Sequence, residues 1–234
     1  MTAAPLAGRT AVVTGGSRGI GRAIAERLSA AGARVTVLAR DAEALGRVAR
    51  ELGARTIPCD VADDEDIDRA LEQLGEAPDI LVNNAGLFQP KPFDETSPAA
   101  LAAALEVNLV APFRLAHAII PTMRERGNGD IVSIGSIADH QTFPGNAAYG
   151  ASKHGLRALH EVMRTELRGT GVRVTLISPG PVDTSLWDEI GPDSREGFTP
   201  RSRMLTPNAV AAAVLFAVTQ PREVDIELVR LSRS

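Results

Sequence analysis

Thr10-Ala-Val-Val-Thr-Gly-Gly-Ser-Arg-Gly-Ile-Gly21 is the stretch of sequence that decides the fold. Its β-branched first half favours a strand, and the apolar pattern that starts at Gly19 favours a helix. Gly15, Gly19 and Gly21 would let the backbone approach a pyrophosphate, to which the first turn of the helix offers unpaired N–H groups. The spacing is Gly-x-x-x-Gly-x-Gly, so a plain tight turn between strand and helix is the alternative reading of this stretch alone.

Downstream, β-branched runs continue to alternate with longer amphipathic segments. The predicted strands cover residues 10–14, 34–38, 55–59, 79–82, 130–134, 172–177 and 224–231. The predicted helices cover residues 19–31, 42–52, 63–74, 98–126, 147–168 and 206–219, with a kink near Pro112 in the longest. This alternation predicts a single α/β domain over residues 1–234, with a seven-stranded, mostly parallel, doubly wound sheet and helices on both faces. Ligands of such folds bind beyond the carboxyl ends of the strands.

The composition narrows the classes of function. Lys plus Arg number 25 and Asp plus Glu number 29, so the net charge is −4 and gives no attraction to a phosphate backbone. Aromatic residues make up 3% of the chain, too few for a base-stacking surface, so we expect no nucleic-acid partner. The single cysteine, Cys59, cannot form an intramolecular disulfide or a Cys-rich zinc site. The four histidines show no metal-like arrangement, and no metal is expected (His117, His140, His154 and His160).

Two features bear on cellular location. The longest apolar run, Ala209–Val218, is far shorter than the roughly 20 residues that span a bilayer. The N-terminus shows no pattern typical of a secretion signal. We therefore expect a cytoplasmic protein without a membrane partner.

Chemically useful side chains follow the fifth predicted strand. Tyr149 and Lys153 are four residues apart on a predicted helix, so a phenol and an ammonium group share one face. A neighbouring cation stabilises phenolate and lowers the pKa of tyrosine, which gives a general acid/base usable near neutral pH. Ser136 precedes this pair, and its hydroxyl could bind a substrate carbonyl. The alternatives are a chance surface pair and a loop serine that caps backbone groups.

Amide side chains cluster after the fourth predicted strand. Asn83-Asn-Ala-Gly86 ends that strand, and Asn108 lies in the long helix that follows. These amides either tie strands together or line a cofactor cleft.

Together these motifs resemble those of a classical short-chain dehydrogenase/reductase, from Thr10 to Asp183 and more loosely beyond. The resemblance implies a Rossmann-type fold and hydride transfer between a nicotinamide cofactor and a carbonyl compound or secondary alcohol. It implies that Tyr149 is the catalytic acid/base, and that Lys153 lowers its pKa and contacts the nicotinamide ribose. It further implies that Ser136 polarises the substrate oxygen and that Asn108 supports a proton-relay water beside Lys153.

The resemblance also implies the cofactor contacts. Asn84–Gly86 should edge the cofactor and Asp60 should contact adenine, although Asp60 could equally be a cap or a solvated carboxylate. The turn at Pro179–Gly180 should touch the carboxamide. The full set of expected cofactor-binding residues is Gly15, Ser17, Arg18, Gly19, Ile20, Gly21, Arg40, Asp60, Val61, Asn84, Ala85, Gly86, Tyr149, Lys153, Pro179, Gly180, Val182 and Thr184.

The end of the second predicted strand bears on which dinucleotide binds. An NAD site usually has an acidic residue there to hold the ribose 2′-hydroxyl. Here the strand ends at Ala39 and is followed by Arg40, while Asp41 lies beyond the tip. Arg18 in the glycine loop points to the same corner, and two guanidinium groups suit a 2′-phosphate. We therefore expect NADP(H), with two surface arginines as the alternative.

Residues 183–205 form the one long irregular stretch, which we expect to be a substrate loop with Trp187 in a lid. Arg195, Arg201 and Arg203 either meet an anionic substrate group or belong to a solvated loop. The candidate pocket residues are mostly apolar, with core packing as their alternative role (Leu87, Phe88, Ile137, Phe143, Leu186 and Trp187).

The resemblance also implies a homo-oligomer, a dimer or a tetramer, joined through the helices that contain Asn108 and Tyr149. Two other functions are compatible with the scaffold: a redox-neutral enzyme such as an epimerase or dehydratase, and an NADP-binding regulatory protein. The intact glycine motif and the complete set of Ser136, Tyr149 and Lys153 favour the oxidoreductase.

Overall fold

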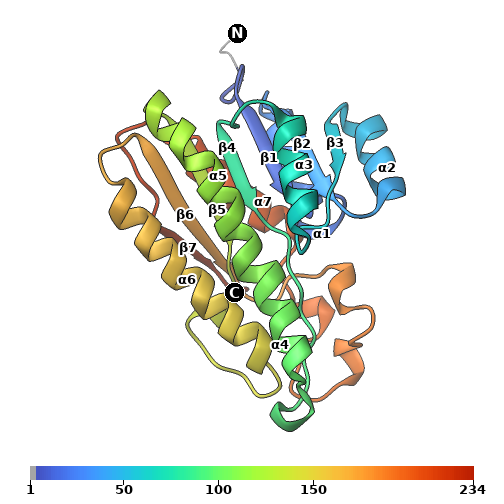
Figure 1. The fold of residues 1–234 in the computed structure, drawn as a ribbon. Helices are drawn as coiled ribbons and strands as arrows, with labels where there is room; N and C mark the ends of the chain where they lie inside the picture. The colour runs from blue at the N-terminus through green and yellow to red at the C-terminus, as the bar shows by residue number, and fades with distance from the viewer. Residues whose placement is uncertain (1–3) are drawn as a thin grey trace.

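The computed structural model describes residues 4–234 and contains seven strands in one sheet (Figure 1). The strands are β1 (Thr10–Thr14), β2 (Arg34–Ala39), β3 (Arg55–Pro58), β4 (Ile80–Asn83), β5 (Gly129–Ile134), β6 (Val172–Pro179) and β7 (Leu228–Leu231). Their order is β3-β2-β1-β4-β5-β6-β7, and every neighbouring pair is parallel. The predicted seven-stranded, Rossmann-type doubly wound fold is confirmed, with a wholly parallel sheet.

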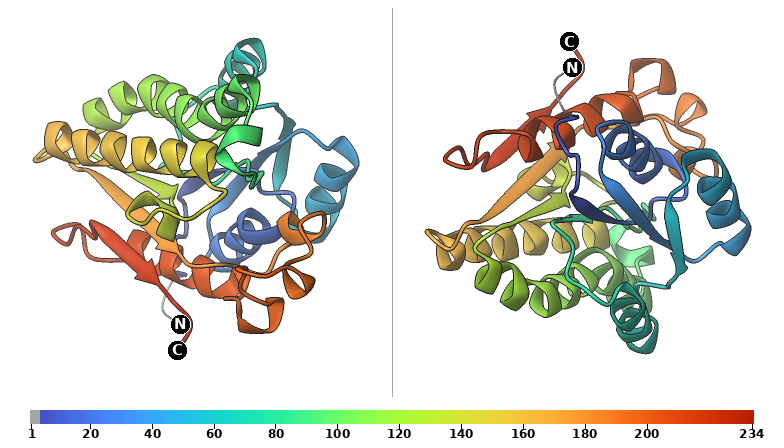
Figure 2. Two further views of the ribbon diagram at one scale, coloured as in Figure 1. Left: turned by 90° about the horizontal axis from the view of Figure 1, so that it is seen from below. Right: turned by 90° about the horizontal axis from the view of Figure 1, so that it is seen from above.

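Helices cover both faces of the sheet, as Figure 2 shows. They are α1 (Gly19–Ala30), α2 (Ala42–Leu52), α3 (Asp64–Leu74), α4 (Pro98–Leu105), α5 (Ala111–Arg126), α6 (Ala147–Leu167) and α7 (Pro207–Val218). Side chains of α1, α2 and α7, such as Ile24 and Val214, share one hydrophobic cluster with the strands. Those of α3, α5 and α6, such as Leu115 and Met163, form the second cluster with the opposite face. Every residue of β5 and β6 is buried, as expected of central parallel strands.

The long predicted helix over residues 98–126 is interrupted just before Pro112. A π-helical turn, Glu106–Val110, joins α4 to α5. Proline has no N–H, so the carbonyl of Asn108 lacks the donor that a residue four positions later normally supplies. The irregularity expected at Pro112 therefore takes the form of a widened turn centred on Asn108.

Two predicted segments differ from the structure near the end of the chain. The last strand begins at Leu228 and not at residue 224. The guanidinium of Arg173 instead donates hydrogen bonds to the carbonyl oxygens of Gln220, Pro221 and Val224 at 2.9–3.1 Å. These bonds keep this part of the backbone from pairing with the sheet. The long stretch over residues 183–205 contains three short 3₁₀ turns (Ser185–Trp187, Pro192–Ser194 and Arg201–Arg203).

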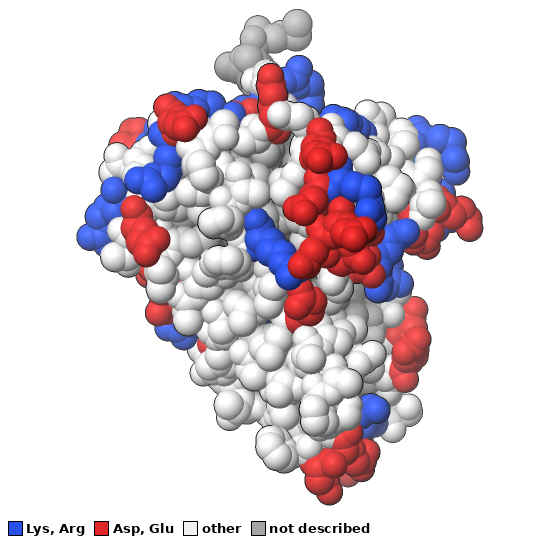
Figure 3. All heavy atoms as spheres, in the orientation of Figure 1, with Lys and Arg blue, Asp and Glu red and all other residues white. Residues whose placement is uncertain are grey.

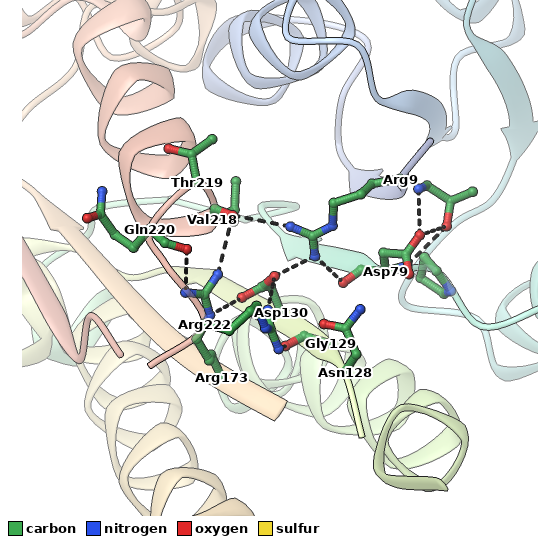
Figure 4. Close-up of polar contacts among 12 residues, drawn as sticks. Arg9, Asp79, Asn128, Gly129, Asp130, Arg173, Val218, Thr219, Gln220 and Arg222 are labelled. Carbon is green, nitrogen blue, oxygen red and sulfur yellow. Dashed lines mark hydrogen bonds and ion pairs between the residues drawn. The ribbon is translucent and has the colours of Figure 1, made fainter. Parts of the chain in front are cut away.

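At the amino-terminal edge of the sheet, one buried carboxylate joins three arginines (Figure 4). Asp130 is 3% exposed, and its oxygens lie 2.5 Å from Arg9, 2.7 Å from Arg173 and 3.1 Å from Arg222. Arg9 and Arg173 also donate to the carbonyl of Val218 at the end of α7. This cluster ties β1, β5 and β6 to the C-terminal segment, at the edge of the sheet opposite the strand ends that carry the predicted motifs.

Candidate active site

A cleft of about 1830 Å³ opens at the carboxyl ends of the central strands. Its walls come from the segments that follow β1, β2, β4, β5 and β6, together with the 183–205 loop. All of the predicted site residues line this cleft except Gly21 and Asn108. The structure thus brings together residues that are separated by up to 169 positions in the sequence, from Gly15 to Thr184.

The glycine loop is shaped by backbone geometry and by one asparagine. Gly15 and Gly19 have φ values of +62° and +55°, a region that side chains other than glycine rarely enter. A Cβ at Gly21 would collide with the carbonyl oxygen of Gly15 and with the Asn84 side chain, so this glycine allows close packing and does not line the cleft. The Asn84 amide donates to the carbonyls of Thr14 and Gly15 at 2.9 and 3.2 Å. Asn84 therefore both ties β4 to the loop and edges the cleft.

The corner after β2 presents cations to the cleft. The Arg40 side chain is 71% exposed and lies 3.7 Å from the Asp60 carboxylate. Asp41 is occupied as the N-cap of α2, because its carboxylate accepts the N–H of Ala44 at 3.0 Å. That hydrogen bond lowers the pKa of Asp41, and the positive charge of Arg18 adds to the effect. The backbone N–H of Ala44 therefore holds the Asp41 carboxylate, while Arg40 stays at the surface beside Asp60.

Ser136, Tyr149 and Lys153 meet in the cleft. Ser136 and Tyr149 both line it, and the Ser136 side chain acts to lower the pKa of Tyr149. The Lys153 ammonium lies 5.7 Å from the centre of the Tyr149 ring and donates to the carbonyl of Ile134 at 2.8 Å. This arrangement puts a phenol, a second hydroxyl and a cation around one point of the cleft, as acid/base chemistry on an oxygen requires.

Burial and neighbouring groups set the pKa values of Tyr149 and Lys153. Burial raises the pKa of Tyr149, opposed by the Ser136 side chain and assisted by the negative charge of Asp139. The expectation that Lys153 lowers this pKa stays a prediction. Burial also lowers the pKa of Lys153 to about 8, against the opposing effect of Asp139.

Asn108 lies behind the cleft and not on its surface. It is fully buried in the π turn, and its amide exchanges hydrogen bonds with the backbone of Leu87 at 2.7 and 2.9 Å. The same amide donates to the Ser152 hydroxyl at 2.9 Å. The Asn108 side chain therefore links the segment after β4 to α6 at Ser152, the residue that precedes Lys153. Its role in a proton relay stays a prediction.

The 183–205 loop folds over the outer part of the cleft. Its base is closed by a bridge between Val182 and Leu205. Arg201 pairs with Asp183 at 2.9 Å and with Asp188, so this arginine holds the loop together. Trp187 is nearly buried and donates to the carbonyl of Val182 at 2.9 Å. Trp187 lines the cleft, and its role in a lid stays a prediction.

Two residues of this region were not singled out from the sequence. Phe198 lines the cleft beside Trp187, and Asp139 is buried behind Ser136. The spacing Ser136-x-x-Asp139 is that of a capping box, in which each residue bonds the backbone N–H of the other. That local signal could have identified Asp139, whereas the position of Phe198 depends on the folding of the whole loop.

Two further properties of the described residues bear on metal binding and on membranes. Within residues 4–234, no group of three or more His, Cys, Asp or Glu side chains is arranged to hold a metal ion. The continuous helix Pro98–Arg126 is long and apolar enough to cross a bilayer, with a mean hydropathy of 1.4 over its best window, of which 33% is buried. The helix was predicted, but its charged residues interrupt the apolar runs on which the membrane expectation rested. Its α5 part packs on the sheet through Leu115, Ile119 and Met123.

The comparisons with known proteins agree with this geometry. Residues 9–195 match the family model of the short chain dehydrogenases. An uncharacterized oxidoreductase of Staphylococcus aureus (strain USA300) is 33% identical over 227 residues, covering 94% of this chain and 95% of the relative. A solved short chain dehydrogenase/reductase family protein superposes with a TM-score of 0.89 at 33% identity, covering 97% of both chains. The closed form of a serine dehydrogenase complexed with NADP+ superposes with a TM-score of 0.87 at 31% identity, covering 95% of this chain and 94% of that one. The fold, the cleft and these matches together show that the chain belongs to the short-chain dehydrogenase/reductase family of oxidoreductases.

Proposed function

We propose that the protein is an NADP(H)-dependent oxidoreductase that interconverts a carbonyl compound and a secondary alcohol. The observation that carries the proposal is the grouping of Ser136, Tyr149 and Lys153 in the same cleft as the glycine loop, with the Lys153 ammonium 5.7 Å from the centre of the Tyr149 ring. The residues present fit a dinucleotide, because the glycines leave the backbone of the loop open and the N-terminus of α1 faces the cleft.

The chain's own residues handle the proton. The chemistry that a bound nicotinamide would supply is hydride transfer to the carbonyl carbon, or from the alcohol carbon in the reverse direction. In reduction, the Tyr149 hydroxyl gives its proton to the substrate oxygen while Ser136 donates a hydrogen bond to the same atom. In oxidation, the Tyr149 phenolate takes the proton of the alcohol, and the Lys153 ammonium opposes the negative charge on the ring. The raised pKa keeps Tyr149 protonated at neutral pH, which is the form that donates the proton in reduction.

The catalytic assignment is tested by Tyr149→Phe, which removes the proton and keeps the ring. We expect kcat to fall by about 10²–10⁴-fold with a panel of carbonyl compounds, since that is the usual contribution of a general acid. The Kd for NADPH should change less than about threefold, because the cleft is otherwise intact. Consumption of NADPH separates hydride transfer from redox-neutral chemistry. Unchanged turnover in the variant would remove Tyr149 from the mechanism.

The preference for NADP(H) rests on the corner after β2. Arg40 and Arg18 leave a positive charge there, and Asp41 is engaged as a helix cap. A related serine dehydrogenase was solved with NADP+, which supports the same reading. We expect NADPH to bind more tightly than NADH, and Arg40→Asp to reverse the order. Arg50→Asp, at an exposed position of α2 that does not line the cleft, is the matched charge control. Equal affinities of the wild-type protein for both dinucleotides would contradict the proposal.

We also propose a cytoplasmic homo-oligomer. Leu101 on α4 and Phe113 on α5 are 37% and 49% exposed, and Val162 on α6 is 52% exposed. Figure 3 shows that few charged side chains lie on the lower part of this face, over α4 and the adjoining part of α6. Burial of these side chains against a second copy would remove apolar surface from water. Light scattering should give a multiple of 24.6 kDa, and Phe113→Glu should reduce it; a monomeric wild-type protein would contradict the proposal.

A further inference from the structure

A row of aromatic rings leads from the reacting phenol to the outside of the cleft. The Phe88 ring lies edge-on to Tyr149, with centroids 4.8 Å apart, and edge-on to Trp187 at 5.3 Å. Trp187 in turn lies edge-on to Phe198 at 6.1 Å. The sequence has six Phe, one Trp and one Tyr, so half of its aromatic residues stand in this one row. Such a concentration, in a chain otherwise poor in aromatic residues, marks the substrate end of the cleft.

The surroundings of this row are apolar. The indole N–H of Trp187 donates to the carbonyl of Val182, so the rest of the indole offers only carbon atoms for contact. Leu87, Ile137 and Leu186 line the same part of the cleft. The Lys153 ammonium is buried beside Tyr149, and the Arg195 guanidinium lies 5.0 Å from the centre of the Phe198 ring. Lys91, Arg195 and Glu196, which also line the cleft, belong to exposed residues. Beyond Lys153, a charged substrate held along the row would lose its hydration without gaining a buried partner.

We propose that the substrate carries a flat, apolar group next to the reacting carbon, as in an aryl ketone or the corresponding secondary alcohol. The inference rests on the proposed function. Aromatic rings pack edge-on or offset on other rings, and the row offers several ring edges and faces beside the Ser136 and Tyr149 hydroxyls. A small polar substrate such as serine, on which one structural relative acts, would leave this wall without a partner.

The test compares acetophenone and 1-phenylethanol with L-serine and 3-hydroxypropanoate, using NADPH or NADP+. We expect kcat/KM to be about 100-fold higher for the aryl pair, in line with the usual effect of an unfilled apolar pocket. Phe88→Leu should raise KM for acetophenone, whereas Phe216→Leu, at an exposed position on α7, should not.

A second measurement does not depend on turnover. Trp187 is the only tryptophan, so acetophenone bound along the row should quench the protein's fluorescence saturably. Saturable quenching without any use of NADPH would leave the substrate class standing and overturn the proposed oxidoreductase function. Preferred turnover of serine, with no saturable quenching, would overturn the substrate class and leave the function standing.

A separate observation concerns Asp139, which is 2% exposed behind Ser136. Its carboxylate accepts the backbone N–H of Ser136 at 3.2 Å and the hydroxyl of Ser178 from β6. The ring nitrogen Nδ1 of His140 lies 2.7 Å from its other oxygen. The carboxylate therefore fixes the backbone that presents the Ser136 hydroxyl.

We infer that Asp139 is a positioning residue, which orients Ser136 and holds a buried negative charge against Tyr149 and Lys153. His140, Tyr149 and Lys153 are the titratable groups that interact with it. The negative charge disfavours phenolate, so it extends to higher pH the range in which Tyr149 can donate a proton. Neither Ser178 nor the backbone of Ser136 carries a charge that could replace this effect.

The test is the pH profile of kcat/KM for reduction by NADPH. In Asp139→Asn the loss of activity at high pH should begin about one unit lower than in the wild type. Asp139→Ser is a second uncharged variant in case the amide does not fold, and NADPH affinity reports folding. Ser178→Ala removes a neutral donor to the same carboxylate and should leave the profile in place. An unmoved profile in a folded Asp139 variant would overturn the inference.

Discussion

Asp130→Ala tests how the amino-terminal edge of the sheet is held together. The variant removes the one carboxylate that faces Arg9, Arg173 and Arg222. The Arg173 side chain is only 7% exposed, so its charge would stay buried without an anionic partner. Breaking a buried ion pair from one side typically costs about 3–5 kcal/mol. For a chain of 234 residues, such a loss lowers Tm by at least about 6 °C.

The assay is urea unfolding, followed by the fluorescence of Trp187 and by circular dichroism. Asp130→Ala should lower the midpoint without a large change in the slope, because the loss is one of stability and not of compactness. Arg222→Ala is the matched control. Its side chain is 44% exposed, and removal of such a solvent-accessible partner should cost less than about 1 kcal/mol. If the two variants were equally stable, the argument from burial would be refuted.

Three further predictions concern the site and its surroundings. Gly21→Ala should weaken NADPH binding by about 10-fold or more, because the added Cβ would collide with the Gly15 carbonyl. The control is Gly46→Ala on α2, where the added Cβ would meet only an arginine side chain. Equal Kd values for the two variants would contradict the packing argument. Oxidation of a secondary alcohol should rise with pH toward 10 and above, because it needs the Tyr149 phenolate, whose pKa is raised; a plateau at pH 7 would be inconsistent with that direction. Burial lowers the pKa of His160 to about 4. Between about pH 6.5 and 4 the unfolded chain therefore binds a proton that the folded chain does not, and the free energy of unfolding falls as the pH falls. His160→Leu should flatten this part of the curve of stability against pH relative to the wild type.

Local spacing predicted the parts of the site that depend on local geometry. The glycines between β1 and α1 need positive φ or close packing, and these needs restrict the sequence over a few residues. The four-residue spacing of Tyr149 and Lys153 similarly places both on one face of α6. These features could be predicted because a single turn or helix determines them.

Properties that depend on distant segments could not be predicted in the same way. The pKa of Tyr149 follows from how deeply the folded chain buries it, which no spacing encodes. The side chain of Asn108 bonds to Leu87 and Ser152, and neither partner is a neighbour in sequence. The last strand was predicted to begin too early for the same reason. Arg173 binds backbone carbonyls within residues 220–224, which keeps them from pairing with the sheet.

The loop that is closed by the bridge between Val182 and Leu205 bears on how enzymes of this fold acquire new substrate specificities. Its two ends meet at one point of the scaffold, and Arg201 fixes its shape through Asp183 and Asp188, which travel with it. The segment can therefore be exchanged between homologues as a cassette, with recombination points at the two bridged residues. Such an exchange would bring in a different Trp187 and Phe198 while leaving β1, α1 and the glycine turn untouched. Divergence of substrate choice on this scaffold thus needs few changes outside one contiguous insert.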